Sequence, residues 1–101
     1  MTLRLVVTLD AQDQINEADI WWFEHRRRMP NRVEEEVARA FALLVESPGI
    51  GVLYSNKNVP GLRRYRLHGT PYYIYYSVDS DKESLVVAAL WSAMRNEGLS
   101  I

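Results

Sequence analysis

The chain has 101 residues, of which 48% are hydrophobic and 25% charged, proportions typical of one globular domain rather than of a disordered chain. A formal net charge of -1 argues against a generally basic nucleic-acid coat protein, and the lack of cysteine excludes a disulfide framework or a thiolate metal site. We expect one cytoplasmic domain over residues 1–101, with no signal peptide and no membrane span, because no apolar run approaches the roughly 20 residues that a membrane helix needs.

Apolar and polar residues alternate over residues 3–9, which predicts an amphipathic strand at the start of the chain. Asp10 suits the N-cap of a first helix. Pro30 ends this helix, because the preceding residue, Met29, is pushed out of the α region. Apolar residues within the helix recur at helical spacing, at Ile15, Ala18, Trp22 and Met29, and Ile20, Trp21 and Phe23 widen the stripe.

A second helix is predicted from Asn31, which with Glu34 fits a capping box, to the stop at residues 47–49. Arg32 and Glu36 are expected to be neighbours on its outer face. The short link between the helices predicts an antiparallel hairpin. The expected buried stripe of the second helix is Val33, Val37, Ala40, Phe41 and Leu44.

The second half of the chain reads as a long loop over residues 48–62 followed by three strands, over residues 63–68, 72–78 and 85–91. The first of these strands alternates Arg64, Arg66 and His68 with apolar neighbours, so one of its faces is basic. The next contains four tyrosines, and the last is almost entirely apolar, which indicates burial on both faces.

The predicted order of strand, two helices and three strands defines an α+β fold, an antiparallel sheet with a helical hairpin packed on one face. Two helices can cover one face of a sheet only. Because the last two strands are apolar or aromatic on both sides, the other face is expected to be covered by something else, such as a partner.

Several short segments stand out in this order: Ala18–Trp22, Glu34–Glu36, Ser47–Gly51, Pro60–Leu67, Tyr72–Asp79 and Ala89–Trp91 leading to Arg95. Together they resemble the ParE/RelE superfamily of bacterial toxins. The resemblance implies a small cytoplasmic growth-inhibiting toxin, often associated with plasmid stabilization, that forms a hetero-oligomer with a cognate antitoxin. ParE-like members are associated with poisoning DNA gyrase, whereas RelE-like members cleave mRNA on the ribosome.

The departures from the RelE pattern favour the ParE branch. RelE-like enzymes place a basic pair on the second strand, which Arg64 and Arg66 match here. They also have an arginine early in the third strand, where this chain has Tyr73, and a tyrosine or histidine near the C-terminus, where this chain has neither after Trp91. Arg95 could supply the remaining arginine. The alternatives are an endonuclease using Arg64, Arg66 and Arg95, or an inactivated relative that only binds.

By this resemblance, contacts with the target are expected at Arg64, Arg66 and Arg95. Contacts with the antitoxin are expected at Trp21, Trp22, Tyr73, Tyr75 and Trp91. Each set also has an ordinary structural interpretation, as the solvated face of a strand or as core. His25 and His68 stand alone without ligand spacing, so neither a metal site nor a cofactor is expected.

Overall fold

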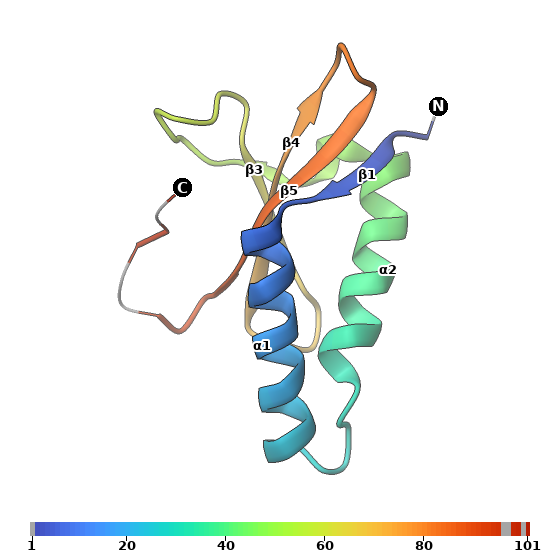
Figure 1. The fold of residues 1–101 in the computed structure, drawn as a ribbon, viewed down its shortest axis with the longest axis vertical. Helices are drawn as coiled ribbons and strands as arrows, with labels where there is room; N and C mark the ends of the chain where they lie inside the picture. Colours follow the sequence, from blue (N-terminus) through green and yellow to red (C-terminus); the bar gives the residue numbers. More distant parts are fainter. Residues whose placement is uncertain (1, 96–97, 100) are drawn as a thin grey trace.

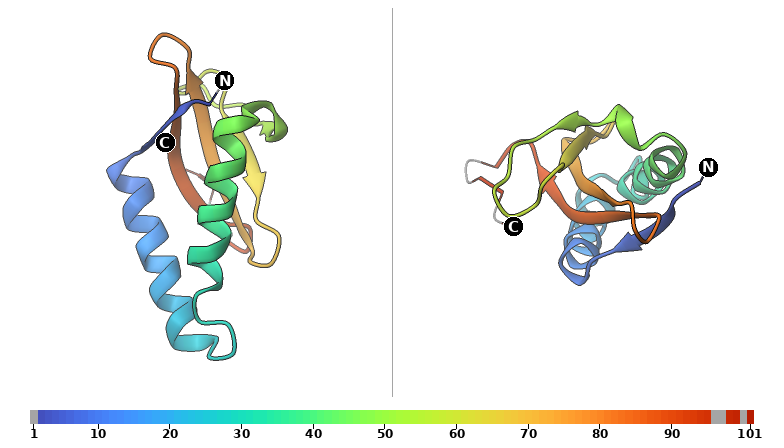
Figure 2. Two further views of the ribbon diagram at one scale, coloured as in Figure 1. Left: turned by 90° about the vertical axis from the view of Figure 1, so that its right-hand side faces the viewer. Right: turned by 90° about the horizontal axis from the view of Figure 1, so that it is seen from above.

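A computed structural model describes residues 2–95, 98–99 and 101 and confirms the α+β fold. Two helices lie side by side as one layer against one face of a five-stranded sheet, whose strand order is β1-β5-β4-β3-β2 (Figures 1 and 2). Within the described residues, no helix is both long and apolar enough to cross a membrane. The elements are β1 (Arg4–Val7), α1 (Leu9–His25), α2 (Arg32–Glu46), the 3-10 helix η1 (Pro48–Ile50), β2 (Val52–Leu53), β3 (Arg63–Arg66), β4 (Tyr72–Asp79) and β5 (Ser84–Ser92).

The sheet is mixed rather than antiparallel throughout. β1 pairs with β5 in the parallel direction, while every other neighbouring pair is antiparallel. Parallel strands need a long connection, and here both helices and the other strands lie between the two. Alternation along the sequence cannot reveal this direction, because the side-chain period is the same in both kinds of pair.

A fifth strand, β2, lies inside the stretch that we expected to be a loop. The Tyr76 hydroxyl holds this segment, donating to the Pro48 carbonyl at 2.6 Å and accepting from the Gly51 amide at 2.9 Å. A Cβ on Gly51 would overlap the Tyr76 ring and hydroxyl, so this approach requires glycine. Burial raises the pKa of Tyr76, which keeps its hydroxyl protonated as the donor.

β5 contains one extra residue relative to β4. Tyr76 pairs with Val87 and Tyr75 pairs with Ala89, which leaves Ala88 as a bulge. A bulge changes which side chains point to each face. The side chains of Leu85 and Val87 before the bulge and Leu90 after it therefore all pack in the cluster under the helices, whereas Ala89 and Trp91 pack on the opposite face.

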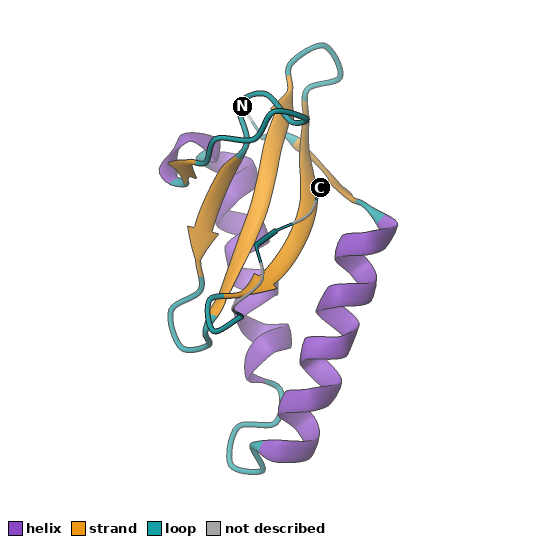
Figure 3. Cartoon of the chain, turned by 90° about the vertical axis from the view of Figure 1, so that its left-hand side faces the viewer, coloured by secondary structure: helices purple, strands orange, loops and turns teal. Residues whose placement is uncertain are grey.

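The second face of the sheet is partly covered by the chain itself. Leu62, Tyr75 and Ala89 form a small buried cluster there, and Leu99 and Ile101 pack against it. The side-chain amide of Asn58 donates from Nδ2 to the Ile101 carbonyl at 3.0 Å, which joins the loop before β3 to the C-terminal segment. In Figure 3 the described part of that segment lies in front of the strands, on the side away from the helices.

The start of α1 differs from the prediction. The N-cap is Thr8, whose hydroxyl accepts from the Ala11 amide at 3.2 Å, so the prediction of Asp10 at this position was wrong. The strand accordingly ends at Val7, and Leu9 opens the helix with 85% of its surface exposed. Threonine and aspartate both favour N-caps, so the sequence does not choose between them.

The link between the helices also differs. α1 ends at His25, four residues before Met29, because Arg26 leaves helical geometry with φ -125° and ψ 72°. Asn31 does precede α2, but its side chain makes no capping hydrogen bond, so the predicted capping box with Glu34 is absent.

Glu36 is buried rather than on the outer face of α2, and it connects this helix to the β3–β4 turn. Its carboxylate accepts from Arg32 Nε at 2.6 Å and from the Thr70 hydroxyl at 2.9 Å. The Gly69 backbone amide also donates to it. A Cβ on Gly69 would overlap the Arg32 guanidinium and the Glu36 carboxylate, so a larger residue there would displace these two groups. We call these four residues the Glu36 clamp.

The core predicts a strong effect of a charge at Val87, which is fully buried. Val87→Asp should cost several kcal/mol and unfold the protein, because an unpaired carboxylate would lie between the sheet and the helices. The control is Val52→Asp, at a position with 69% exposure, which should leave the melting temperature nearly unchanged. Circular dichroism melting of both variants tests this, and a native melting curve for Val87→Asp would contradict it.

The Glu36 clamp predicts acid sensitivity. Burial raises the pKa of Glu36, but the hydrogen bonds from Arg32, Gly69 and Thr70 together outweigh it, so the pKa lies below its ordinary value of 4.5. A lowered pKa in the folded state stabilises the fold above the unfolded-state value, and this contribution disappears as the pH falls through the folded-state pKa. Glu36→Gln should therefore be less stable than wild type at pH 7, by about 1–3 kcal/mol.

Urea unfolding at neutral pH and at several pH values below 4.5 measures this difference. The gap between wild type and Glu36→Gln should narrow as the pH falls. Glu35→Gln, at an exposed neighbouring position, is the matched control and should show little change. A gap that stays constant with pH would contradict a charged Glu36 as the source of the stability.

Candidate functional site

A row of large polar and aromatic side chains crosses three strands on the sheet face opposite the helices. Arg66 of β3 pairs with Tyr73 of β4, which in turn pairs with Trp91 of β5. Arg64 pairs with Tyr75 one step further along the same face. The alternation of β3 thus produces the predicted basic face at Arg64 and Arg66, but the strand ends at Arg66, and His68, which was also expected on this face, bonds to Tyr65 instead.

Each of the three predicted target-binding arginines lies over an aromatic ring. The Arg64 guanidinium carbon is 4.3 Å from the Tyr73 ring centre and 5.1 Å from that of Tyr54. Arg66 is 5.4 Å from the Tyr73 ring centre, and Arg95 is 4.1 Å from that of Trp91. These distances are within the range of cation–π attraction. The basic–aromatic face consists of Arg64, Arg66, Arg95, Tyr54, Tyr73 and Trp91.

Arg64 is the most constrained of these cations. A hydrogen bond with the Tyr75 side chain raises the pKa of Arg64, so its charge is permanent at any physiological pH. Tyr75 itself is only 3% exposed, beneath the loop and the C-terminal segment. Of the residues predicted to contact an antitoxin, Tyr75 is therefore not on the surface of this chain, and it supports Arg64 from below.

A cleft of about 710 Å³ lies between α1, the ends of β4 and β5, and the residues that follow β5. Trp21 and Trp22 both line it, with ring centres 6.1 Å apart and planes at 63°, so the two indoles point differently, as their adjacency in a helix predicted. The Arg26 guanidinium lies over both rings, at 5.1 and 5.5 Å. The other lining residues are Gln14, Glu17, Ala18, Pro71, Tyr72, Leu90, Ser92, Met94 and Arg95.

The cleft and the basic–aromatic face meet at Arg95, which lines the cleft and lies over Trp91. Trp21 is the more exposed of the two helix tryptophans, and its ring stacks on His25 at 4.5 Å. Trp22 packs against the core beneath the helices. The structure thus brings all but Tyr75 of the predicted residues to two adjoining surfaces.

Among the described residues, His68 and the outward carboxylates of β3 and β4 lie away from the basic–aromatic face, whose own candidates for proton transfer are tyrosines. His68 bonds to the Tyr65 hydroxyl at 3.1 Å, and Tyr65 packs against the core on the helix side of the sheet. Along the outward positions of β3 and β4, the first carboxylate is Asp79, at the far end of β4. Among the described residues there is no group of three or more His, Cys, Asp or Glu placed to hold a metal ion.

Two members of these surfaces were missed by sequence reasoning. Tyr54 lies in the loop before β3, where nothing in the local pattern signals a contact with Arg64. Arg26 was interpreted only as a cation at a helix end, although it follows Trp21 and Trp22 closely enough on the same helix to reach both. Its position four residues after Trp22 was the available signal.

The fold is shared with solved toxin–antitoxin proteins. It is similar to a chain of the Mycobacterium tuberculosis RelBE2 toxin–antitoxin complex, with TM-score 0.67, 18% identity and coverage of 91% of this chain and 92% of that one. It is also similar to a chain of the intact E. coli RelBE complex, with TM-score 0.65, 19% identity and coverage of 92% of this chain and 99% of that one. A chain of the chromosomal ParDE system of P. aeruginosa is similar with TM-score 0.63, 14% identity and coverage of 90% of this chain and 96% of that one.

The family follows from the sequence. Residues 5–97 match the sequence model of the family described as "ParE toxin of type II toxin-antitoxin system, parDE". The chain belongs to this ParE toxin family, and it is a toxin of the type II toxin–antitoxin class. No curated protein sequence matches it significantly.

Proposed function

We propose that this toxin acts by binding DNA gyrase through its basic–aromatic face, without catalysis of its own. The observation that carries the proposal is the composition of that face, which combines three arginines with aromatic rings, while His68 lies on the other side of the sheet. Membership of the ParE family supports the same target.

The chemistry of RNA cleavage explains why this composition favours binding. Attack by a 2′-hydroxyl requires a base to accept its proton, an acid for the leaving oxygen and a cation for the phosphate. Arginine supplies only the cation, since it does not lose its proton in proteins. Each missing acid or base costs on the order of 10²-fold or more in rate. A toxin that binds its target loses nothing by lacking them.

A ribosome-dependent mRNA endonuclease is the second candidate. It is favoured by one observation, the gathering of Arg64, Arg66 and Arg95 on a single face beside Tyr73. A tyrosine could exchange a proton with RNA in place of histidine. The first candidate inhibits gyrase and leaves mRNA intact, whereas the second cuts mRNA, so assays of supercoiling and of mRNA cleavage separate them directly.

We further propose that a cognate antitoxin occupies the cleft beside α1. The similar structures from M. tuberculosis and E. coli are toxin–antitoxin complexes. In this chain the cleft offers Trp21, Trp22 and Met94 to apolar side chains, with Arg26 and Arg95 at hand for a carboxylate. An amphipathic segment with acidic residues fits this combination.

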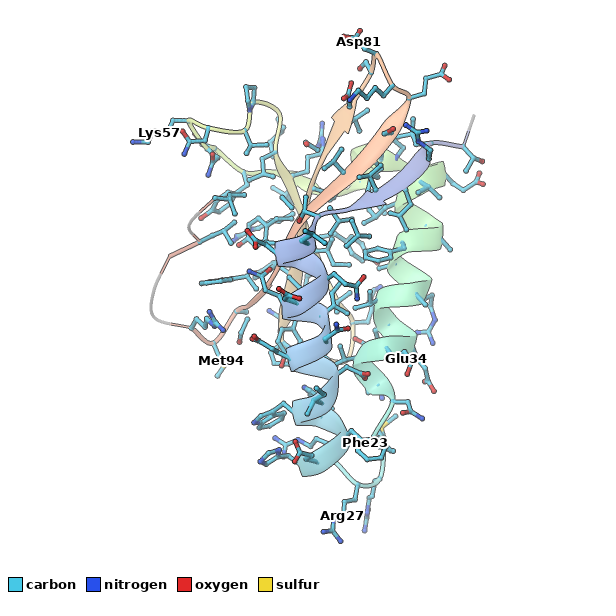
Figure 4. All side chains as sticks on the ribbon, in the orientation of Figure 1. Phe23, Arg27, Glu34, Lys57, Asp81 and Met94 are labelled. Atoms are coloured by element: carbon cyan, nitrogen blue, oxygen red, sulfur yellow. The ribbon has the colours of Figure 1, made fainter. Side chains whose placement is uncertain are left out.

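The antitoxin proposal predicts that Trp21→Ala weakens antitoxin binding by about 30-fold, since a tryptophan hot spot is worth about 2 kcal/mol. Phe23→Ala is the matched control, because Phe23 is more exposed than Trp21 and lies on the other side of α1 from Met94 in Figure 4. Calorimetric titration with the co-encoded antitoxin measures both, and the wild-type melting temperature should rise on binding. Equal affinities for Trp21→Ala and Phe23→Ala would contradict this site.

The gyrase proposal predicts that the purified toxin inhibits supercoiling or traps cleaved DNA, and leaves ribosome-bound mRNA intact. Arg64→Ala/Arg66→Ala and Arg95→Ala should each weaken the inhibition at least 10-fold, and the loss should depend on salt. Arg27→Ala is the control, because Arg27 lies at the tip of the helical hairpin far from this face (Figure 4). Codon-specific mRNA cuts in primer extension, with normal supercoiling at saturating toxin, would assign the protein to the second candidate.

A further inference from the structure

We propose that the basic–aromatic face binds the phosphate backbone of duplex DNA, so that the toxin contacts DNA held by gyrase as well as the enzyme. This inference rests on the proposed function, because it names what the face touches in that complex. Its direct evidence is the geometry of Arg64, Arg66 and Arg95 on Tyr73 and Trp91.

The rings hold the guanidinium groups in place before any ligand arrives. A free arginine side chain carries about 2 kcal/mol of rotamer entropy, part of which is lost when it binds. Here Arg64 lies 4.3 Å and Arg66 5.4 Å from the centre of one ring, that of Tyr73. A guanidinium group supported by a ring keeps N–H donors at its edge that can meet phosphate oxygens.

The same contacts argue against single-stranded nucleic acid. Proteins that bind single strands stack successive bases on aromatic rings, at about 1–3 kcal/mol per base. In this face, Tyr73 lies beneath two arginines and Trp91 beneath Arg95. Bases would have to displace these cations to stack. A duplex keeps its bases stacked internally and presents only phosphates, which is the ligand that the arginine edges fit.

The described residues of the face carry the sign of charge that DNA requires, although the whole chain carries a net charge of -1. On β4 the outward positions nearest to Arg64 and Arg66 hold Tyr73 and Tyr75, and Asp79 is at the opposite end of the strand. A local patch, rather than the net charge, governs attraction within a Debye length of about 8–10 Å. Three arginines predict weak, sequence-independent affinity, with a salt slope of up to about -2.7 in log–log form.

The test is fluorescence anisotropy of the full chain, without gyrase, on a short labelled DNA duplex and on a single-stranded RNA of equal length, between about 50 and about 200 mM salt. The wild type should bind two unrelated duplexes equally, and more tightly than the RNA. Arg66→Ala should lower both the affinity and the magnitude of the salt slope, the latter by about 0.9. Arg27→Ala, which removes the same charge far from the face, should change neither.

Variants of Tyr73 distinguish the contribution of the ring that supports Arg64 and Arg66 from the contribution of the arginine charges. Tyr73→Leu should weaken binding several-fold while leaving the salt slope unchanged, because the three cations remain. Tyr73→Phe keeps the ring and should bind like wild type. If circular dichroism shows that Tyr73→Leu does not fold, Tyr73→Phe still tests the role of the ring. A loss of affinity in Tyr73→Phe would overturn the role of the ring as a support.

Other outcomes overturn the proposal outright. These are no duplex binding by the wild type at low salt, equal losses for Arg66→Ala and Arg27→Ala, or tighter binding to RNA than to duplex. Supercoiling assays on the same preparations keep the two proposals distinct. Inhibition of gyrase without DNA binding refutes only this inference, whereas the expected DNA binding without inhibition refutes the proposed function.

Discussion

The structure depends on one extra residue, Ala88, in the longest strand of the sheet. Without this bulge, the alternation set by Leu85 and Val87 would continue, placing Ala89 and Trp91 under the helices and turning Leu90 outward. Leu90 would then leave the core, Trp91 would have to fit beneath the helices, and Arg95 would lose the ring on which it lies. A single backbone irregularity therefore determines both the packing of the helices and the composition of the basic–aromatic face.

Hydrogen bonds elsewhere in the fold position the β3 and β4 part of that face. The Glu36 clamp fixes the β3–β4 turn against α2, and this turn lies between Arg66, at the end of β3, and Tyr72, the residue before Tyr73 at the start of β4. On the other side Tyr75 is buried and supports Arg64 through a hydrogen bond. Contact groups carried on paired strands keep their positions better than groups on loops, which suits a toxin that works by matching a surface.

The sequence predicted the parts of this arrangement that are recorded locally. Alternation around Arg64 and Arg66 and the run of tyrosines in β4 were sufficient to place the strands and their basic face. It could not predict β2, a strand of two residues held by distant Tyr76, or the burial of Glu36, whose partner Thr70 is 34 residues away. Bulges and long-range hydrogen bonds leave no periodic signal, so the clusters on the two faces emerged only from the structure.

The parallel pairing of β1 with β5 has a consequence for how the toxin is made. The first strand of the described sheet has its partner in the last, so the β1 side of the helix-covered core does not close until residues 84–92 have been synthesised. Contacts between such distant segments form late in folding. A nascent chain therefore cannot complete the β1 side of the core, or place Arg95 over Trp91, until β5 and the residues just after it have been synthesised.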